Sequence, residues 1–151
     1  MDYNRIQNHI VNWLKDYCES ASQNGFVVGV SGGIDSAVTS TLCALTGLPT
    51  LVLHMPILQQ SNQLDRSNEH ISWLQKNFPN IEADQIDLTS SFQSFEATFP
   101  NSIQDHLTMA NLRSRIRMAT LYAFAGNNKC LVAGTGNKVE DFGVGFYTKY
   151  G

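Results

Sequence analysis

One segment combines two adjacent glycines, two serines and an acid between an apolar run and a helical pattern. It reads Gly29-Val30-Ser31-Gly32-Gly33-Ile34-Asp35-Ser36. Glycines at a strand-to-helix turn let backbone N–H groups point into one concavity, without a Cβ that would clash with an approaching oxygen. The following helix adds the positive end of its dipole, and Ser31 and Ser36 add hydroxyl donors. The pattern predicts a site for phosphate groups.

Asp35 is the unexpected residue in such a site, because a carboxylate repels phosphates unless a cation lies between them. Mg²⁺ accepts one or two carboxylates together with phosphate oxygens. Asp35 is therefore predicted to bind the Mg²⁺ that accompanies a nucleotide, with a second carboxylate from Glu140 or Asp141. For a glycine pair taken alone, the alternative is a plain turn in which Asp35 only complements the helix dipole.

Alternating helical and strand patterns must position these residues. Helices are expected at residues 3–20, 34–45, 64–78 and 103–125, with a short helix or irregular link at 90–99. Strands are expected at residues 26–30, 50–55, 81–88 and 130–133. Strands separated by helices indicate an α/β fold, a parallel sheet with helices on both faces.

The order of the strands decides which loops meet. Right-handed crossovers predict the order 3-2-1-4, in which the chain reverses direction between the first and fourth strands. Ligands of such sheets bind at the carboxyl ends of the strands that flank the reversal. The loop at residues 31–36 is therefore expected beside the loop at residues 134–140.

Composition narrows the class of protein. The 151 residues suit one domain, 1–151, with 42% hydrophobic and 15% charged residues. A net charge of −3 argues against general nucleic-acid or membrane-surface binding. The three scattered cysteines lack a CxxC pair and fit buried thiols in a reducing compartment. No apolar run reaches membrane-spanning length and the first residues lack a signal-peptide core, so a cytoplasmic protein is expected.

The motifs resemble those of a known family. Ser31-Gly32-Gly33-Ile34-Asp35-Ser36 resembles the SGGxDS loop of the N-type ATP pyrophosphatases, which split ATP between its α- and β-phosphates and adenylate a substrate. Residues 111–118, NLRSRIRM, resemble the stretch N-x-x-A-R-x-R-M. Residues 134–140, GTGNKVE, and 145–151, GFYTKYG, resemble the signature of the NAD synthetases. The likeness runs from about residue 25 to residue 151.

The resemblance implies an adenine-nucleotide α-hydrolase-like fold and a function. The family amidates deamido-NAD to NAD with ammonia, through an adenylated intermediate, releasing AMP and pyrophosphate. Carried over by position, the ATP-binding residues are Gly29, Val30, Ser31, Gly32, Gly33, Ile34, Asp35, Ser36 and Thr135. The same carry-over gives Arg115 and Lys149 to deamido-NAD, and Asp35 and Glu140 to Mg²⁺.

The arginines of the 111–118 stretch are expected to differ in role. Residues two apart on a helix diverge by about 200°, so Arg115 points away from Arg113 and Arg117. Arg117 is expected to serve packing or assembly. The family is dimeric, and the helix at 103–125 is the candidate contact of a homodimer.

Departures from the family leave alternatives open. Family members continue well beyond the KYG stretch, so the chain resembles the N-terminal portion of the family domain, and whether it turns over alone is open. No amidase-like segment precedes the first strand, so ammonia rather than glutamine is the expected nitrogen source. The alternatives are a tRNA-thiolating or GMP-forming pyrophosphatase, or a non-catalytic ATP-binding fragment.

Overall fold

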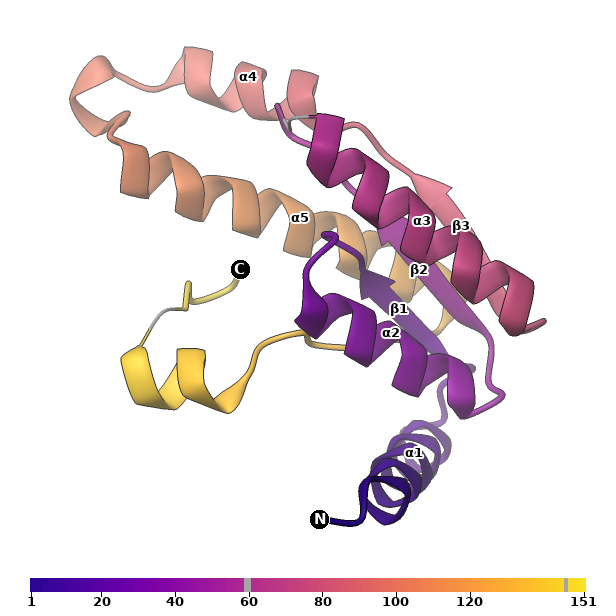
Figure 1. Cartoon of the computed structure of the whole chain (residues 1–151). Coiled ribbons are helices and arrows are strands. Elements are labelled where there is room, and N and C mark those ends of the chain that lie inside the picture. The colour runs from indigo at the N-terminus through magenta and orange to yellow at the C-terminus, as the bar shows by residue number, and fades with distance from the viewer. Residues whose placement is uncertain (59–60, 146) are drawn as a thin grey trace.

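A parallel sheet lies at the centre of the computed structural model, which describes residues 1–58, 61–145 and 147–151 (Figure 1). Side chains of residues 61–64 fall outside this description. The described residues form four strands, β1 (Phe26–Gly29), β2 (Thr50–His54), β3 (Ile81–Gln85) and β4 (Leu131–Val132). Their order is β3-β2-β1-β4, and every neighbouring pair is parallel. The predicted sheet order is confirmed.

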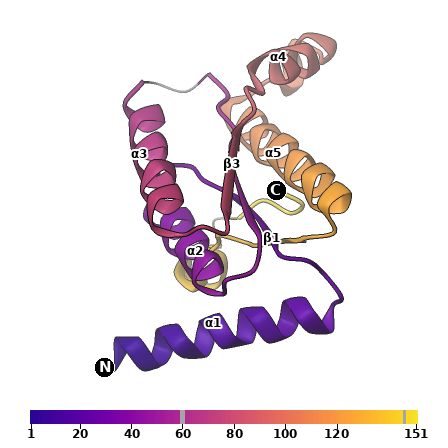
Figure 2. The same ribbon diagram turned by 90° about the vertical axis from the view of Figure 1, so that its right-hand side faces the viewer.

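Helices cover both faces of the sheet, as predicted (Figure 2). The helices are α1 (Tyr3–Ser20), α2 (Ile34–Leu45), α3 (Ser61–Asn77), α4 (Thr89–Thr98), α5 (His106–Asn128), the 3₁₀ turn η1 (Asn101–Ile103) and the π-helix η2 (Val139–Val144). One face carries α2 and α3, with α1 packed beside α2, and the other carries α4 and α5. None of the helices in the described ranges is long and apolar enough to cross a membrane.

Two apolar clusters hold the layers together, one on each face of the sheet. Because strand residues alternate between faces, Val28 and Val52 pack toward Leu74 of α3, whereas Val27 and Leu53 pack toward Leu121 of α5. All of these side chains are buried. The clusters anchor α2 and α5 on opposite faces, and both helices extend to the edge where β1 and β2 end.

Several predicted boundaries are corrected by the structure. The long helix begins at His106 rather than at residue 103, because the Asp105 side chain accepts hydrogen bonds from the N–H groups of Leu107 and Thr108. Residues 101–103 form the separate turn η1. The helix continues beyond Ala125 to Asn128, where Lys129 ends it in a left-handed conformation with φ of 53°.

The strands are shorter than the apolar runs that predicted them. β4 spans two residues, because only Leu131 and Val132 pair with β1. β3 ends at Gln85 rather than at residue 88, since His54 is the last residue of β2 that pairs with it. The uncertain segment at 90–99 is the regular helix α4. The π-helix η2 was not predicted, because its apolar side chains are exposed and show no helical periodicity.

Candidate functional site

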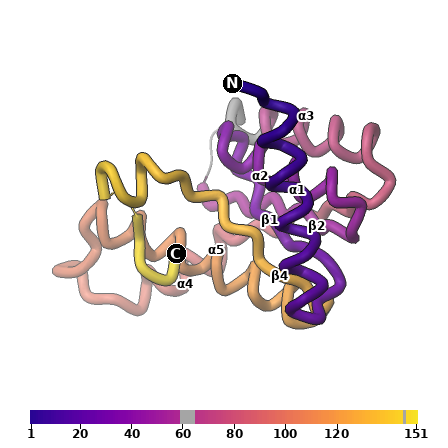
Figure 3. Tube along the Cα trace, turned by 90° about the horizontal axis from the view of Figure 1, so that it is seen from below, coloured from indigo at the N-terminus to yellow at the C-terminus, as the bar shows by residue number. Residues whose placement is uncertain are grey.

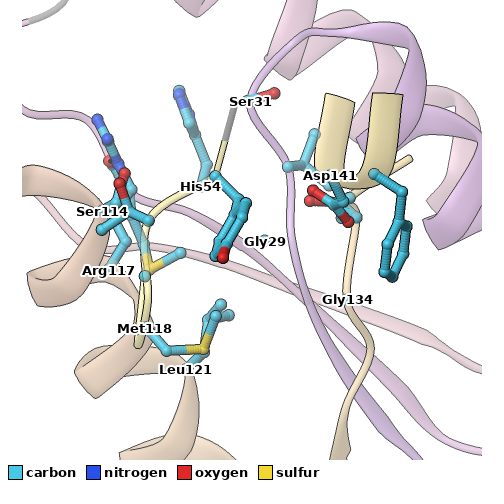
Figure 4. A pocket seen from close by; sticks show the side chains of 17 residues that line it. Gly29, Ser31, His54, Ser114, Arg117, Met118, Leu121, Gly134 and Asp141 are labelled. Carbon is cyan, nitrogen blue, oxygen red and sulfur yellow. Dashed lines mark hydrogen bonds between the residues drawn. The ribbon is translucent and has the colours of Figure 1, made fainter. Parts of the chain in front are cut away.

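A cavity of about 700 Å³ opens at the carboxyl ends of β1 and β2. Its lining comes from Gly29–Ser31 after β1, His54 and Met55 after β2, one face of α5, the loop after β4, η2 and the last residues of the chain. This volume is typical of pockets for small-molecule ligands. In Figure 4, Ser114 and Arg117 lie on one side of the cavity and Asp141 on the other, with Gly29 between them.

Glycine at position 29 keeps the floor of the cavity open. A Cβ built there would lie 3.2 Å from Met55 Cε and 3.5 Å from Leu121 Cδ1. A side chain there would crowd the Met55 methyl group and fill space between Met55 and Leu121, which line the cavity from the end of β2 and from α5. His54, the last residue of β2, is buried and lines the same wall.

Hydrogen bonds within the glycine-serine loop fix its shape. The Ser36 hydroxyl donates to the Gly33 carbonyl at 3.1 Å and accepts from the Ser31 N–H at 3.2 Å. The Gly33 N–H donates to the Ser31 hydroxyl at 3.3 Å, and Gly32 takes the left-handed φ of 83° that favours glycine. The serines therefore shape the loop internally, and the N–H groups of the first turn of α2 are the donors left for an anion.

The loops after β1 and β4 meet at the reversal of the sheet, as the strand order predicted. Asn137 Nδ2 donates to Asp35 Oδ1 at 3.4 Å, and Asn137 Oδ1 accepts from the N–H groups of Val139 and Glu140 at 3.1 and 3.0 Å. Asn137 thus connects the first turn of α2 to the start of η2. No hydrogen bond in the described ranges joins Asp35 and Glu140 directly.

The two acids of η2 face different surroundings. The Glu140 side chain is exposed and does not line the cavity. Asp141 lines the cavity, and its carboxylate packs over Gly136, where an added Cβ would lie 2.6 Å from Asp141 Oδ2. Both acids were predicted as candidates for the second carboxylate, and of the two only Asp141 lines the cavity.

The three arginines of α5 differ in environment. Arg113 Cζ lies 4.3 Å from the centre of the Phe92 ring, and Arg117 Nε donates to the Met55 carbonyl at 3.0 Å. Arg115 is exposed and donates to the Lys149 carbonyl instead, so the predicted divergence is confirmed. Arg117 lines the cavity, although the sequence assigned it to packing or assembly. Burial lowers the pKa of Arg117, and the neighbouring charge of Arg113 lowers it further.

The last residues of the chain return to α5 and close one side of the cavity (Figure 3). Arg115 Nε donates to the Lys149 carbonyl at 3.2 Å, and the Thr148 hydroxyl is hydrogen-bonded to Asn111 Oδ1. The two residues assigned to deamido-NAD are therefore neighbours. Phe146, part of the GFYTKYG motif, lies outside the described residues.

The predicted site residues divide into two groups. Four of them line the cavity, namely Gly29, Val30, Ser31 and Thr135. The others lie outside its lining in the described structure, namely Gly32, Gly33, Ile34, Asp35, Ser36, Arg115, Glu140 and Lys149. The cavity also contains residues that the sequence did not assign to binding, among them Arg117, Phe142 and Tyr147. In the sequence, only the Arg-x-Arg spacing pointed to Arg117 as a possible site residue. That spacing does not indicate which arginine faces the sheet.

Comparisons with known proteins agree with one another. A family model described as NAD synthase matches residues 6–151. The chain is 40% identical to the NH₃-dependent NAD⁺ synthetase of Methanosarcina acetivorans over 156 aligned residues, and 38% identical to that of Methanocaldococcus jannaschii. These matches cover 100% and 97% of the chain but 59% and 56% of the relatives. The chain therefore spans somewhat more than half the length of these curated relatives.

Solved structures with a similar fold agree with these sequence matches. The chain superimposes on an NMN synthetase from Francisella tularensis with a TM-score of 0.90 at 36% identity, covering 100% of this chain and 61% of that one. An NH₃-dependent NAD synthetase from Campylobacter jejuni, solved with a nitrate ion, gives a TM-score of 0.89 at 30% identity, covering 100% of this chain and 63% of that one.

Proposed function

Because the chain belongs to the NAD synthase family, we propose that it carries the ATP-binding part of an ammonia-dependent NAD⁺ synthetase. The reaction is the ATP-dependent amidation of deamido-NAD to NAD, with release of AMP and pyrophosphate. This ligase activity is favoured over that of a tRNA-thiolating or GMP-forming enzyme, because the relatives named above are NAD and NMN synthetases.

One observation carries the proposal from the structure. The cavity lies at the carboxyl ends of β1 and β2, next to the loop after β4, and Gly29, Val30 and Ser31 at the start of the glycine-serine loop line it. The N–H groups of the first turn of α2, which follow in the same loop, and the dipole of that helix favour a polyphosphate at this edge of the cavity. The adjoining apolar wall, with Met55, Met118 and Leu121, suits a nucleobase or another flat ring.

In this proposal residues 29–36 and Thr135 bind ATP, and Arg115 and Lys149 bind deamido-NAD. The nicotinate carboxylate attacks the α-phosphorus of ATP, pyrophosphate leaves with the electrons of the broken P–O bond, and ammonia then displaces AMP from the acyl group. The protein's part is to orient the two substrates and to stabilise charge on the phosphoryl oxygens. No side chain needs to become a covalent nucleophile.

The residues at the reversal fit a Mg²⁺ ion that is shared with a nucleotide. Asp35 and Glu140 are oxygen donors on two loops that Asn137 joins. The described residues contain no group of three or more His, Cys, Asp or Glu that could hold a metal by themselves. Mg²⁺ commonly takes one or two carboxylates and completes its octahedron with phosphate oxygens and water. When bound, the ion would neutralise charge on the transferring phosphoryl group.

A second acceptor is worth testing, because the Francisella tularensis structure is named as an NMN synthetase at 36% identity. Its name makes nicotinate mononucleotide a candidate acceptor that shares the nicotinate carboxylate with deamido-NAD.

We also propose a homodimer assembled through α5, on which Leu107 and Tyr122 are exposed. Sedimentation equilibrium tests the dimer, and a monomer at all concentrations would contradict it. The cytoplasmic location stays a prediction from cysteine usage.

The activity is tested by incubating the chain with ATP, Mg²⁺, an ammonium salt and either deamido-NAD or nicotinate mononucleotide. From deamido-NAD we expect AMP, pyrophosphate and NAD in equal amounts, and from nicotinate mononucleotide a smaller amount of its amide, NMN. More NMN than NAD would make the mononucleotide the preferred acceptor. Binding of ATP without pyrophosphate release under either acceptor would contradict an enzyme and favour a nucleotide-binding module.

A further inference from the structure

Arg117 is a cation in the wall of the cavity that the site described so far does not use. It lies on α5 at the level of Met55, the first residue after β2. Its Nε donates to the Met55 carbonyl at 3.0 Å, which ties the guanidinium to the wall. The two Nη groups make no hydrogen bond or ion pair with any part of the chain that the structure describes.

Leaving this cation without a counter-charge is costly. A charge removed from water loses solvation free energy, which an anionic partner usually restores. Arg117 has a neighbour of the same sign, Arg113, which adds to the cost. Asp141 is the acid that lines the same cavity, but Figure 4 has it on the opposite side, and no ion pair joins the two. The counter-charge is therefore expected from a ligand.

The neighbourhood of Arg117 indicates the chemistry of that ligand. Gly29, Val30 and Ser31, the start of the glycine-serine loop, line the same cavity. An anion held by the N–H groups of this loop would be repelled by Asp141 and attracted by Arg117. The Nε–H of Arg117 is held by the Met55 carbonyl, and the two Nη groups remain as donors. A guanidinium in this arrangement is suited to bind two oxygens of one phosphoryl group.

We propose that Arg117 binds a phosphoryl group of ATP in the cavity, with Nε held by the Met55 carbonyl and the Nη groups donating to phosphate oxygens. The choice of ATP rests on the proposed function. Arg117 is then a binding residue of the cavity that the start of the glycine-serine loop also lines, and it lies on the opposite side from Asp141. Because Met55 follows β2 directly, the same contact orients the segment after β2 against the nucleotide.

The test compares ATP and adenosine as ligands in isothermal titration with Mg²⁺ present. Arg117→Gln removes the charge and keeps a polar side chain, and Arg117→Lys keeps the charge but loses the two-pronged geometry. Arg113→Gln is the matched control, since it removes an arginine one helical turn away that packs on Phe92 outside the cavity. Thermal unfolding without ligand checks that each variant folds.

We expect Arg117→Gln to weaken ATP binding by about 10- to 100-fold, the range for hydrogen bonds to charged groups. Adenosine affinity should stay unchanged, Arg117→Lys should fall between, and Arg113→Gln should bind as the unaltered chain does. Unchanged ATP affinity in Arg117→Gln, or an equal loss for ATP and adenosine, would overturn the proposal. A loss confined to titrations with deamido-NAD would overturn the assignment to ATP.

Separate measurements test the role of Arg117 and the proposed amidation reaction. The amidation reaction is judged on the unaltered chain, by whether NAD forms. The role of Arg117 is judged by the difference in ATP affinity between the variants and the unaltered chain. A chain that binds ATP through Arg117 but forms no NAD would retain the inference and lose the function. A chain that binds no ATP would lose both.

Discussion

Asn137 Nδ2 donates a hydrogen bond to Asp35 Oδ1 at 3.4 Å, although 102 positions separate the two residues in the sequence. The same asparagine accepts the Glu140 N–H at 3.0 Å through its side-chain oxygen. One side chain therefore spans the reversal between β1 and β4 and brings together the two loops that carry the proposed Mg²⁺ ligands. A ligand bound at either loop is expected to affect the other.

A double-mutant cycle on Asp35→Asn and Glu140→Gln tests whether one ion is shared. Each change should weaken Mg-ATP binding, and the double change should cost less than the sum, because losing one ligand already forfeits most of the metal affinity. Asp35→Asn should alter folding stability by only about 0.3–1 kcal/mol, the value of a first-turn acid at a helix N-terminus. Titration calorimetry with and without Mg²⁺ measures the cycle. Strict additivity would defeat the shared ion.

Arg115→Ala should weaken deamido-NAD binding by about tenfold or more, if the side chain donates charge-assisted hydrogen bonds to the dinucleotide. Loss of its bond to the Lys149 carbonyl should also loosen residues 147–151. Arg113→Ala is the matched control, because Arg113 packs on Phe92 instead. The two affinities are compared by titration with deamido-NAD. Equal affinities in the two variants would remove Arg115 from the dinucleotide site.

Gly136→Ala should disturb the cavity without unfolding the chain. The added Cβ would lie 2.6 Å from Asp141 Oδ2, so the carboxylate must rotate away from its position over the glycine. Gly143→Ala is the control, since Gly143 does not line the cavity and a Cβ there would meet only Val139 Cγ1, at an ordinary 3.8 Å. We expect ATP affinity to change in Gly136→Ala and to stay constant in Gly143→Ala. Identical affinities would show that the position of Asp141 is irrelevant to the nucleotide.

Gly25→Ala should destabilise the fold severely. Its Cβ would lie 1.9 Å from the Pro49 carbonyl oxygen, a backbone atom that also accepts the Phe26 N–H and cannot rotate away. Overpacking of this kind lowers the free energy of unfolding by about 1–3 kcal/mol, occasionally more. In α5, no atom lies within 4 Å of a Cβ built at Gly126. Gly126→Ala should therefore raise the free energy of unfolding by about 0.5–1 kcal/mol through helix propensity. Urea unfolding of both variants measures the contrast, and equal midpoints would contradict it.

His70 should make folding stability sensitive to pH. Burial lowers its pKa below the ordinary 6.5, so the unfolded chain binds the proton more readily than the folded one. Stability is then lost as the pH falls below 6.5 and levels off below the folded pKa. His70→Gln should flatten this part of the profile relative to the unaltered chain. Urea midpoints across the range test the prediction, and parallel profiles for the variant and the unaltered chain would refute it.

The strand order and the meeting of the two loops were predictable from the sequence. Hydrophobic periodicity marks strands and helices, and the handedness of parallel crossovers follows from the chirality of the residues. Those two facts brought residues 31–36 beside residues 134–140, where Asn137 now contacts Asp35. The glycine-serine loop was likewise predictable, since a sharp strand-to-helix turn that receives an anion restricts which residues can stand there.

The tertiary structure alone decided which side chains face the cavity. Successive helical residues differ by about 100°, so the packing of α5 on the sheet selects Arg117 for the cavity and leaves Arg115 to residues 147–151. In the same way, the π-helix turns Asp141 inward and Glu140 outward. The sequence names charged residues at these positions, but their directions depend on contacts with segments far away in the chain, which no local pattern contains.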